Sequence, residues 1–425
     1  MYRIAGADVH KKVLSIVVMD LEDPESPIQR RRALYTPEAL HQLVEWFVEM
    51  GVEEVVMEST AQYWQTLWHT LEVHWQPHRR QRPGAPPKAG ELHLAQAQSN
   101  RAPHGRKNDF ADAERLVRRL AAQELILSFV PGLEQRLWRT LMRRRTQLME
   151  ARSTLQSQME NFLEQAHVKL ATLASDLFGV SMIRILAALG QGESDPQALL
   201  ELRESNMKTT AEQWIDVLRP CCQWNRHYRL VVSQIIAELR LLDAQVKELE
   251  NSAAELMSPY QDAVQRLAEI PGMGVVSALQ VIAEIGPQAA TFPTPGDLSS
   301  WVGAIPGENI TAGHNYSTHS PKGNRHLRRL LNQVALAAIK TKGSIFELKF
   351  QKFRARQTYK SATWCIAHFL CELIWIVLHK GVRYQERGPG LIAQNQRKRL
   401  NRMKRHLRAH GYTVLPPNAT APSVA

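Results

Sequence analysis

Four acidic residues near the start of the chain have local sequences suited to holding a divalent cation. Asp8 follows a short run of small residues, and Glu58 follows a run of apolar ones. Asp109 and Asp112 are three residues apart, so one face of a helix would present both. Carboxylates that converge from separate elements hold the Mg²⁺ ions that assist cleavage of phosphodiester bonds. The set therefore predicts a metal-dependent phosphoryl-transfer site.

An α/β layer domain over residues 1-130 would position these acids, because β-like and helix-like runs alternate there. We predict strands at Tyr2–Val9, Val13–Met19, Val52–Met57 and Leu92–Ala95, and helices at Pro37–Met50, Tyr63–Leu71 and Phe110–Ala122. An opening hairpin, a later strand that ends in Glu and a helix that carries acids are in ribonuclease-H-like order. Any one of these acids alone is more simply explained as a solvated residue or as one that complements a helix dipole. The ordered set of four favours the metal site.

Composition points to a nucleic-acid partner. The 425 residues carry 53 Lys and Arg against 41 Asp and Glu, a net charge of +12 that favours a polyanion. The four cysteines are too few and too poorly spaced for a disulfide framework or a zinc site, which indicates a reducing cytoplasm. The apolar segment Ala362–Leu378 contains His368 and Glu372, so it predicts a buried helix and no membrane span. We expect a soluble protein.

The middle of the chain carries two long helical patterns with a heptad seam. The seam residues are Leu141, Leu148, Leu155 and Phe162 in the first helix and Val232, Ile235, Leu239, Leu242, Val246 and Leu249 in the second. This pattern predicts a coiled coil. An intramolecular antiparallel hairpin and a dimer interface both satisfy it.

Five arginines crowd the start of the first of these helices. They are Arg136, Arg139, Arg143, Arg144 and Arg145. Such a charge run is usually a solvated face, and on a basic chain contact with nucleic acid is an equal alternative.

A glycine turn, Ile270–Gly274, lies between two helical runs. Gly272 and Gly274 would let backbone N–H groups at a helix start approach a phosphate, as in helix-hairpin-helix modules on DNA. A tight interhelical turn that uses glycine for positive φ is the alternative explanation.

Two further motifs, at residues 301–313 and 320–329, complete a pattern that covers nearly the whole chain. With Asp8, the Glu58-Ser59-Thr60 motif and Asp109 with Asp112, the chain resembles the DEDD transposases of bacterial insertion sequences, the insertion-sequence one-ten family. Relatives of that family include Piv-type DNA invertases and bridge-RNA-guided recombinases.

The resemblance implies four regions along the chain. Residues 1-130 would form a RuvC-like catalytic domain, 131-257 a helical coiled-coil spacer, 258-385 a mainly helical transposase domain, and 386-425 a basic tail. The metal would be Mg²⁺ or Mn²⁺. DNA is the implied partner, with a structured guide RNA as a further one, and the protein would be cytoplasmic and nucleoid-associated.

The resemblance also implies a covalent step, in which a serine of the second domain attacks a DNA phosphate. Thr311 occupies that position here, and its bulkier, rotamer-restricted secondary alcohol would attack more slowly. The family pattern assigns nucleic-acid contacts to Lys322, Asn324, Arg325, Arg328 and Arg329, with a solvated helix face as the alternative for the arginines.

Because the acids and Thr311 are far apart in the chain, a homodimer or homotetramer would complete the site between protomers. Two alternatives to a DNA transposase remain. One is a RuvC-like structure-specific nuclease that uses a metal-bound water, and the other is an inactive nucleic-acid-binding relic of a mobile element.

Overall fold

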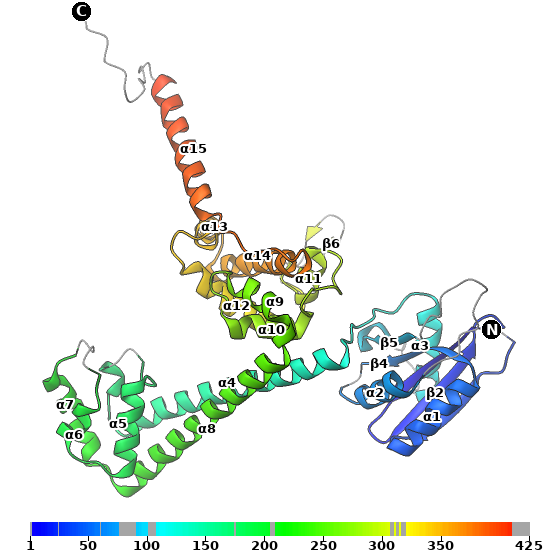
Figure 1. The fold of residues 1–425 in the computed structure, drawn as a ribbon, viewed down its shortest axis with the longest axis horizontal. Coiled ribbons are helices and arrows are strands. Elements are labelled where there is room, and N and C mark those ends of the chain that lie inside the picture. Colours follow the sequence, from blue (N-terminus) through cyan, green and yellow to red (C-terminus); the bar gives the residue numbers. More distant parts are fainter. Residues whose placement is uncertain are drawn as a thin grey trace, which may run out of the picture. The chain divides into compact units, whose positions relative to one another are not determined.

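The computed structural model describes residues 2–23, 25–59, 61–75, 91–100, 108–173, 176–204, 209–306, 310–311, 314–315 and 320–409. The chain divides into two units, Met1–Pro131 and Gly132–Ala425, and each is considered by itself (Figure 1). Thr60 of the predicted Glu58 motif lies outside the described residues.

The first unit is built on a five-stranded mixed sheet in the order β3-β2-β1-β4-β5. The strands are β1 (Arg3–Val9), β2 (Val13–Asp20), β3 (Gln29–Leu34), β4 (Val52–Glu58) and β5 (Glu91–Ala95). The first three strands pair antiparallel, while β4 is parallel to both β1 and β5. All four strands that the sequence predicts are present, and β3 is an additional edge strand.

Helices cover both faces of this sheet. Helix α1 (Pro37–Glu49) and helix α2 (Trp64–His74) pack on one face, and α3 (Asp109–Ala121) packs on the other. A short 3₁₀ turn, η1 (Ala97–Asn100), follows β5. Apolar residues alternate along the central strands, which gives each face its own core.

The second unit contains the two long helices α4 (Leu133–Gln165) and α8 (Arg226–Leu256), which run side by side (Figure 1). Arg145 lies 2.6 Å from Glu250, and Arg152 lies 2.6 Å from Asp243. Residue numbers rise along α4 while those of their partners fall along α8, so the two helices are antiparallel. Within the chain, the two helices therefore form the antiparallel hairpin, one of the two arrangements that the heptad pattern allows.

Shorter helices complete this unit. One core is shared by α4, α8 and the helices α5 (Val180–Gln191), α6 (Pro196–Glu201) and α7 (Ala211–Cys222). The 3₁₀ turn η2 (Leu170–Thr172) also contributes to this core. A second core joins the beginning of α4 to η3 (Ser258–Tyr260), α9 (Gln261–Ala268), α10 (Val275–Ile285), α11 (Pro295–Val302), α12 (Arg325–Ile339), α13 (Ile345–Arg354) and α14 (Tyr359–His379). The last described helix is α15 (Gly388–Ala409).

Helix α14 is long and apolar enough to cross a membrane, yet 56% of its most apolar window is buried within the unit. It packs against α11, α12 and α13, and Trp375 on it donates a hydrogen bond to Phe292 O at 2.8 Å. It is therefore a core helix of this unit, in line with the buried helix predicted at Ala362–Leu378.

Candidate active site

Asp8 lies at the carboxyl end of β1, on the sheet face that α3 covers. Side chains alternate along a strand, so Ile4, Gly6 and Asp8 share this face. Gly6 lets α3 come close, because a Cβ there would lie 2.2 Å from the carbonyl oxygen of Ala113. The first turn of α3, which carries Asp109 and Asp112, is thereby brought next to Asp8.

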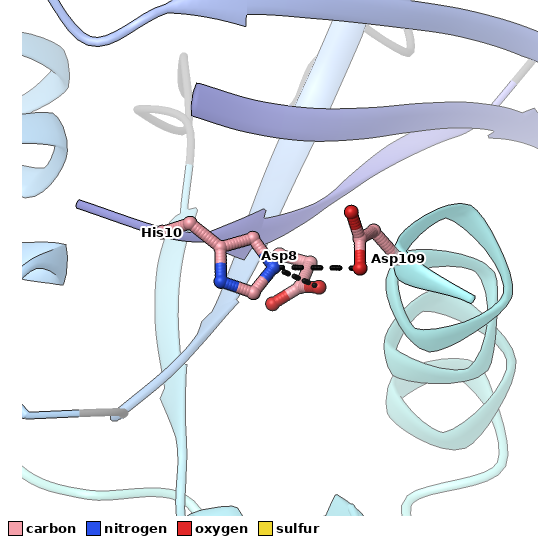
Figure 2. A group of neighbouring side chains, drawn as sticks. All are labelled: Asp8, His10 and Asp109. Atoms are coloured by element: carbon pink, nitrogen blue, oxygen red, sulfur yellow. Dashed lines mark ion pairs between the residues drawn. The ribbon is translucent and has the colours of Figure 1, made fainter. Parts of the chain in front are cut away.

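His10 links two of the predicted acids (Figure 2). Its Nε2 atom lies 3.1 Å from Asp8 Oδ2 and 3.5 Å from Asp109 Oδ1. These three ligand atoms lie within 4.8 Å of one another, a spacing that suits a divalent cation. His10 was not among the predicted ligands, although it lies only two residues after Asp8, directly beyond the end of β1.

Glu58 and Asp112 are joined by a second group of contacts. Asn100 donates a hydrogen bond from Nδ2 to Glu58 Oε2 at 2.8 Å. Arg115 donates from Nε to Asn100 Oδ1 at 3.3 Å and forms an ion pair with Asp112. The two carboxylates are therefore oriented by a buried amide and a guanidinium, neither of which the sequence analysis identified.

The four acids also influence one another electrostatically. Burial raises the pKa of Asp8 and His10 lowers it, while the charges of Asp109, Asp112 and Glu58 raise it. The contacts link the four predicted carboxylates in two groups, Asp8 with Asp109 through His10 and Glu58 with Asp112 through Asn100 and Arg115, and Asp109 and Asp112 share the first turn of α3.

The donor set of this cluster fits a hard cation. Asp8 Oδ2 and His10 Nε2 are both buried atoms, 3.1 Å apart, and among the described residues neither has a hydrogen-bond partner of good geometry, so both suit a metal ligand. Four carboxylates are the type of donors that Mg²⁺ and Mn²⁺ prefer, and a cation would offset their mutual repulsion.

Thr311 lies in the second unit, in a short hairpin of β6 (Ile310–Thr311) and β7 (His314–Asn315). The two strands are antiparallel, and Thr311 pairs with His314 through the backbone. The neighbouring motif residues Ala312 and Gly313 lie outside the described part of the chain.

The predicted nucleic-acid residues around α12 have different surroundings. Lys322 and Arg325 are exposed. Asn324 caps α12, because its Oδ1 accepts from the amides of His326 and Leu327 at 2.9 and 3.0 Å. Its Nδ2 donates to Glu284 Oε2 at 2.9 Å, so this side chain has a structural role within the protein.

The other two arginines of α12 are engaged within the protein. Arg329 forms an ion pair with Glu150 of α4. Arg328 donates to the carbonyl oxygen of Gly303 at 2.6 Å, and its guanidinium lies over the ring of Trp364 at 4.6 Å.

The glycine turn at Ile270–Gly274 is a tight interhelical turn, one of the two roles considered for it, and the phosphate contact stays a prediction. Gly272 has φ +82°, and a Cβ there would lie 2.5 Å from Ala338 N of α12, so it makes a tight turn in close contact with a neighbouring helix. Gly274 begins α10 and is exposed, and a Cβ there would meet no atom within 4 Å. The amide end of α10 is therefore open at Gly274.

Two arginines at the start of α4 form ion pairs with a buried carboxylate of α10. Arg143 donates from Nε and Nη2 to both carboxylate oxygens of the buried Glu284 at 2.8 and 2.9 Å. Arg139 lies 3.5 Å from the same carboxylate, and burial lowers the pKa of Arg139 to about 10. For these two residues the structure shows a third role, beyond the solvated face and the nucleic-acid contact weighed from sequence.

Comparison with known families assigns the class of the protein. Residues 5–168, which include all four acids, match a DEDD transposase model of the IS110 type. Residues 264–351, which include Thr311 and α12, match the model described as the transposase IS116/IS110/IS902 family. The chain is a transposase, a class of enzyme that cuts and rejoins DNA.

Two relatives lead to the same assignment. A probable family 20 transposase of Pseudomonas aeruginosa is 24% identical over 288 residues, which is 66% of this chain and 75% of the relative. A protein of Streptomyces coelicolor, named an uncharacterized 43.6 kDa protein of insertion element IS110, is 25% identical over 162 residues, 38% of this chain and 39% of the relative. The chain belongs to the IS116/IS110/IS902 family of transposases.

Proposed function

We propose that this transposase acts as a DNA recombinase of an insertion sequence, with a DEDD metal site in a ribonuclease-H/RuvC-like domain and Thr311 as its nucleophile. The observation that carries the metal site is the geometry at Asp8, His10 and Asp109, whose ligand atoms lie within 4.8 Å of one another. Partial burial, and then the charges of Asp109, Asp112 and Glu58, raise the pKa of Asp8, and a cation would offset this repulsion.

Asp8, Glu58, Asp109 and Asp112 would hold Mg²⁺ or Mn²⁺. A bound metal pair stabilises charge on both the attacking and the leaving oxygen of a phosphoryl transfer. The protein's own contribution is orientation: Asn100 fixes Glu58, and Arg115 fixes Asp112. His10 lies between Asp8 and Asp109 and would serve as a further ligand or as a partner that orients them.

Thr311 supplies the covalent step of the proposal. Its hydroxyl oxygen forms a bond to a DNA phosphorus, the phosphodiester bond to one sugar oxygen breaks, and that oxygen leaves as a hydroxyl after taking up a proton. The phosphothreonine link conserves the phosphodiester energy for strand exchange. A second DNA hydroxyl then attacks the link and releases Thr311.

The assembly and the partners form a further part of the proposal. The acids belong to the first unit and Thr311 to the second, so we propose a homodimer or homotetramer that completes the site between protomers. Helix α15 carries seven Lys and Arg: Arg397, Lys398, Arg399, Arg402, Lys404, Arg405 and Arg408. This basic helix suits contact with the phosphates of DNA or of a structured guide RNA.

An adduct assay tests the proposal. Wild type, Thr311→Ala, Thr311→Ser and Asp8→Ala are incubated with Mg²⁺ and nicked or bridged DNA, and protein–DNA adducts are resolved on denaturing gels. We expect adducts with wild type, more with Thr311→Ser, and none with Thr311→Ala or Asp8→Ala. Cleavage without adducts that survives Thr311→Ala would make the protein a nuclease that uses water. Inactive wild type, with activity gained in Thr311→Ser, would identify a relic.

A further inference from the structure

The base of the Thr311 hairpin is a closed contact between two stretches of backbone. The chain leaves α11 through Val302 and Gly303, and it returns through residues 320–323 to the start of α12. The amide of Asn324 donates to Trp301 O at 3.2 Å. A Cβ on Gly323 would lie 2.2 Å from Val302 O, so this glycine permits the two stems to touch.

Arg328 joins both stems from the first turn of α12. Its Nη1 donates to Gly303 O on the outgoing stem at 2.6 Å and to Pro321 O on the returning stem at 3.0 Å. Its Nη2 donates to Ser320 Oγ at 2.9 Å. Trp364 of α14 supports the guanidinium from one face at 4.6 Å, which fixes its plane.

Gly303 is shaped to receive this guanidinium. It has φ +75°, in the left-handed region that favours glycine, and it ends α11. A Cβ there would lie 2.6 Å from Arg328 Nη1 and 2.6 Å from Pro321 O. The space that a side chain would need at this position is taken by the arginine and by the returning stem.

We propose that Arg328 is a positioning residue that clamps the base of the hairpin and so sets the place of Thr311. This inference rests on the proposed role of Thr311. It differs from the sequence-based expectation that Arg328 contacts nucleic acid, because three of the five guanidinium N–H groups are used within the protein. Arg325, three residues earlier on the same helix, is exposed and donates from Nε to His326 Nε2 at 3.4 Å, and its terminal nitrogens would meet a phosphate.

Four variants test the clamp: Arg328→Ala, Arg328→Lys, Gly303→Ala and, as the matched control, Arg325→Ala. Hydrogen exchange of the Asn324 amide is measured in the full-length protein without DNA, so this readout does not depend on Thr311 chemistry. We expect exchange at least about tenfold faster in the first three variants and unchanged in Arg325→Ala. Lysine keeps the charge but cannot form the fork, so it would not restore the clamp.

DNA binding and adduct formation separate positioning from phosphate contact. At saturating DNA the adduct rate of Arg328→Ala and Arg328→Lys should fall about 100-fold, with Kd and its salt dependence unchanged. Arg325→Ala should instead raise Kd and reduce its salt slope by about 1.

A salt slope that falls by about 1 in Arg328→Ala and is restored in Arg328→Lys, with Asn324 exchange unchanged, would overturn the clamp. If wild type forms no adduct, the proposed nucleophile fails, and Asn324 exchange still decides the clamp. Gly303→Ala disrupts the contact between Gly303 and Arg328 by changing Gly303 instead of the arginine. If Arg328→Ala does not fold, the Asn324 exchange rate of Gly303→Ala therefore decides whether the clamp exists.

Discussion

Asn100 donates a hydrogen bond of 2.8 Å to Glu58 and is only 2% exposed. A buried amide costs free energy unless its donors and acceptors are satisfied, and here both of its ends face site residues. Its Oδ1 accepts from Arg115, which in turn pairs with Asp112. A neutral side chain thus orients a carboxylate without cancelling the charge that a cation requires.

Replacing Asn100 with alanine should therefore weaken metal binding more than it weakens folding. We expect the Mg²⁺ concentration for half-maximal DNA cleavage to rise by about 10- to 100-fold, as for other residues that orient metal ligands. A Mg²⁺ titration of cleavage measures this. Ser99→Ala, in the same 3₁₀ turn, is the control and should keep the wild-type midpoint. Equal midpoints for the two variants would mean that the Asn100 contact is structural only.

Gly6→Ala tests how the sheet positions the acids of α3. The new Cβ would meet Ala113 O at 2.2 Å and Val117 Cγ2 at 2.8 Å, so α3 must move away from β1. We expect a lower melting temperature and a loss of cleavage of at least about 100-fold, since Asp109 and Asp112 move with the helix. Gly132→Ala, where a Cβ would meet no atom within 4 Å, should change neither property. Wild-type cleavage by Gly6→Ala would show that the close approach of α3 is not needed.

Asp8→Asn should stabilise the metal-free protein while it abolishes activity. The pKa of Asp8 is raised above its ordinary value of 3.8, so ionised Asp8 destabilises the fold. The stability that protonated Asp8 gives the fold is fully present below the ordinary pKa of aspartate, and it is lost as the pH rises through the raised pKa of Asp8. In EDTA at pH 7 the variant should therefore melt at a higher temperature than wild type, and the difference should vanish below about pH 4.

Saturating Mg²⁺ supplies the control for this prediction. It should raise the melting temperature of wild type and leave that of Asp8→Asn nearly unchanged, because only wild type gains binding free energy. A variant that melts below wild type in EDTA at pH 7 would contradict the destabilising role of the Asp8 charge.

The strands that carry Asp8 and Glu58 could be predicted because their apolar runs end in acids. Strand β3 could not, since its run Gln29–Leu34 contains three arginines and resembles a loop. As an edge strand it pairs on one side only, and cationic side chains are tolerated there. Pattern methods respond to burial, and this strand has little of it.

Side chains whose partners are distant in the sequence were harder to predict than the acids themselves. Asn100 is the last residue of a short 3₁₀ turn, and nothing in its local sequence marks it as buried. Arg143 resembles one member of a solvated charge run, because its partner Glu284 is distant in sequence. Both roles depend on contacts between distant segments, to which local patterns carry no signal.

Glu284→Gln tests the buried ion pair that joins Glu284 of α10 to Arg139 and Arg143 of α4. Glu284 is 4% exposed, and although burial alone would raise its pKa, Arg143 and Arg139 hold that pKa below the ordinary value. Glutamine leaves the buried Arg139 without its counter-charge. Breaking such a pair costs about 3 kcal/mol, the lower end of the usual range, because Arg143 is 37% exposed and partly solvated.

Urea unfolding at pH 7 measures this loss, with Glu250→Gln as the control. Glu250 pairs with Arg145 at 2.6 Å in a more exposed position, so its loss should cost less than about 1 kcal/mol. Because the folded pKa of Glu284 is lowered, its contribution is present above the ordinary pKa and lost as the pH falls through the lowered one. The gap between wild type and Glu284→Gln should therefore narrow in acid. A gap that is constant with pH would show that the charge of Glu284 does not stabilise this junction.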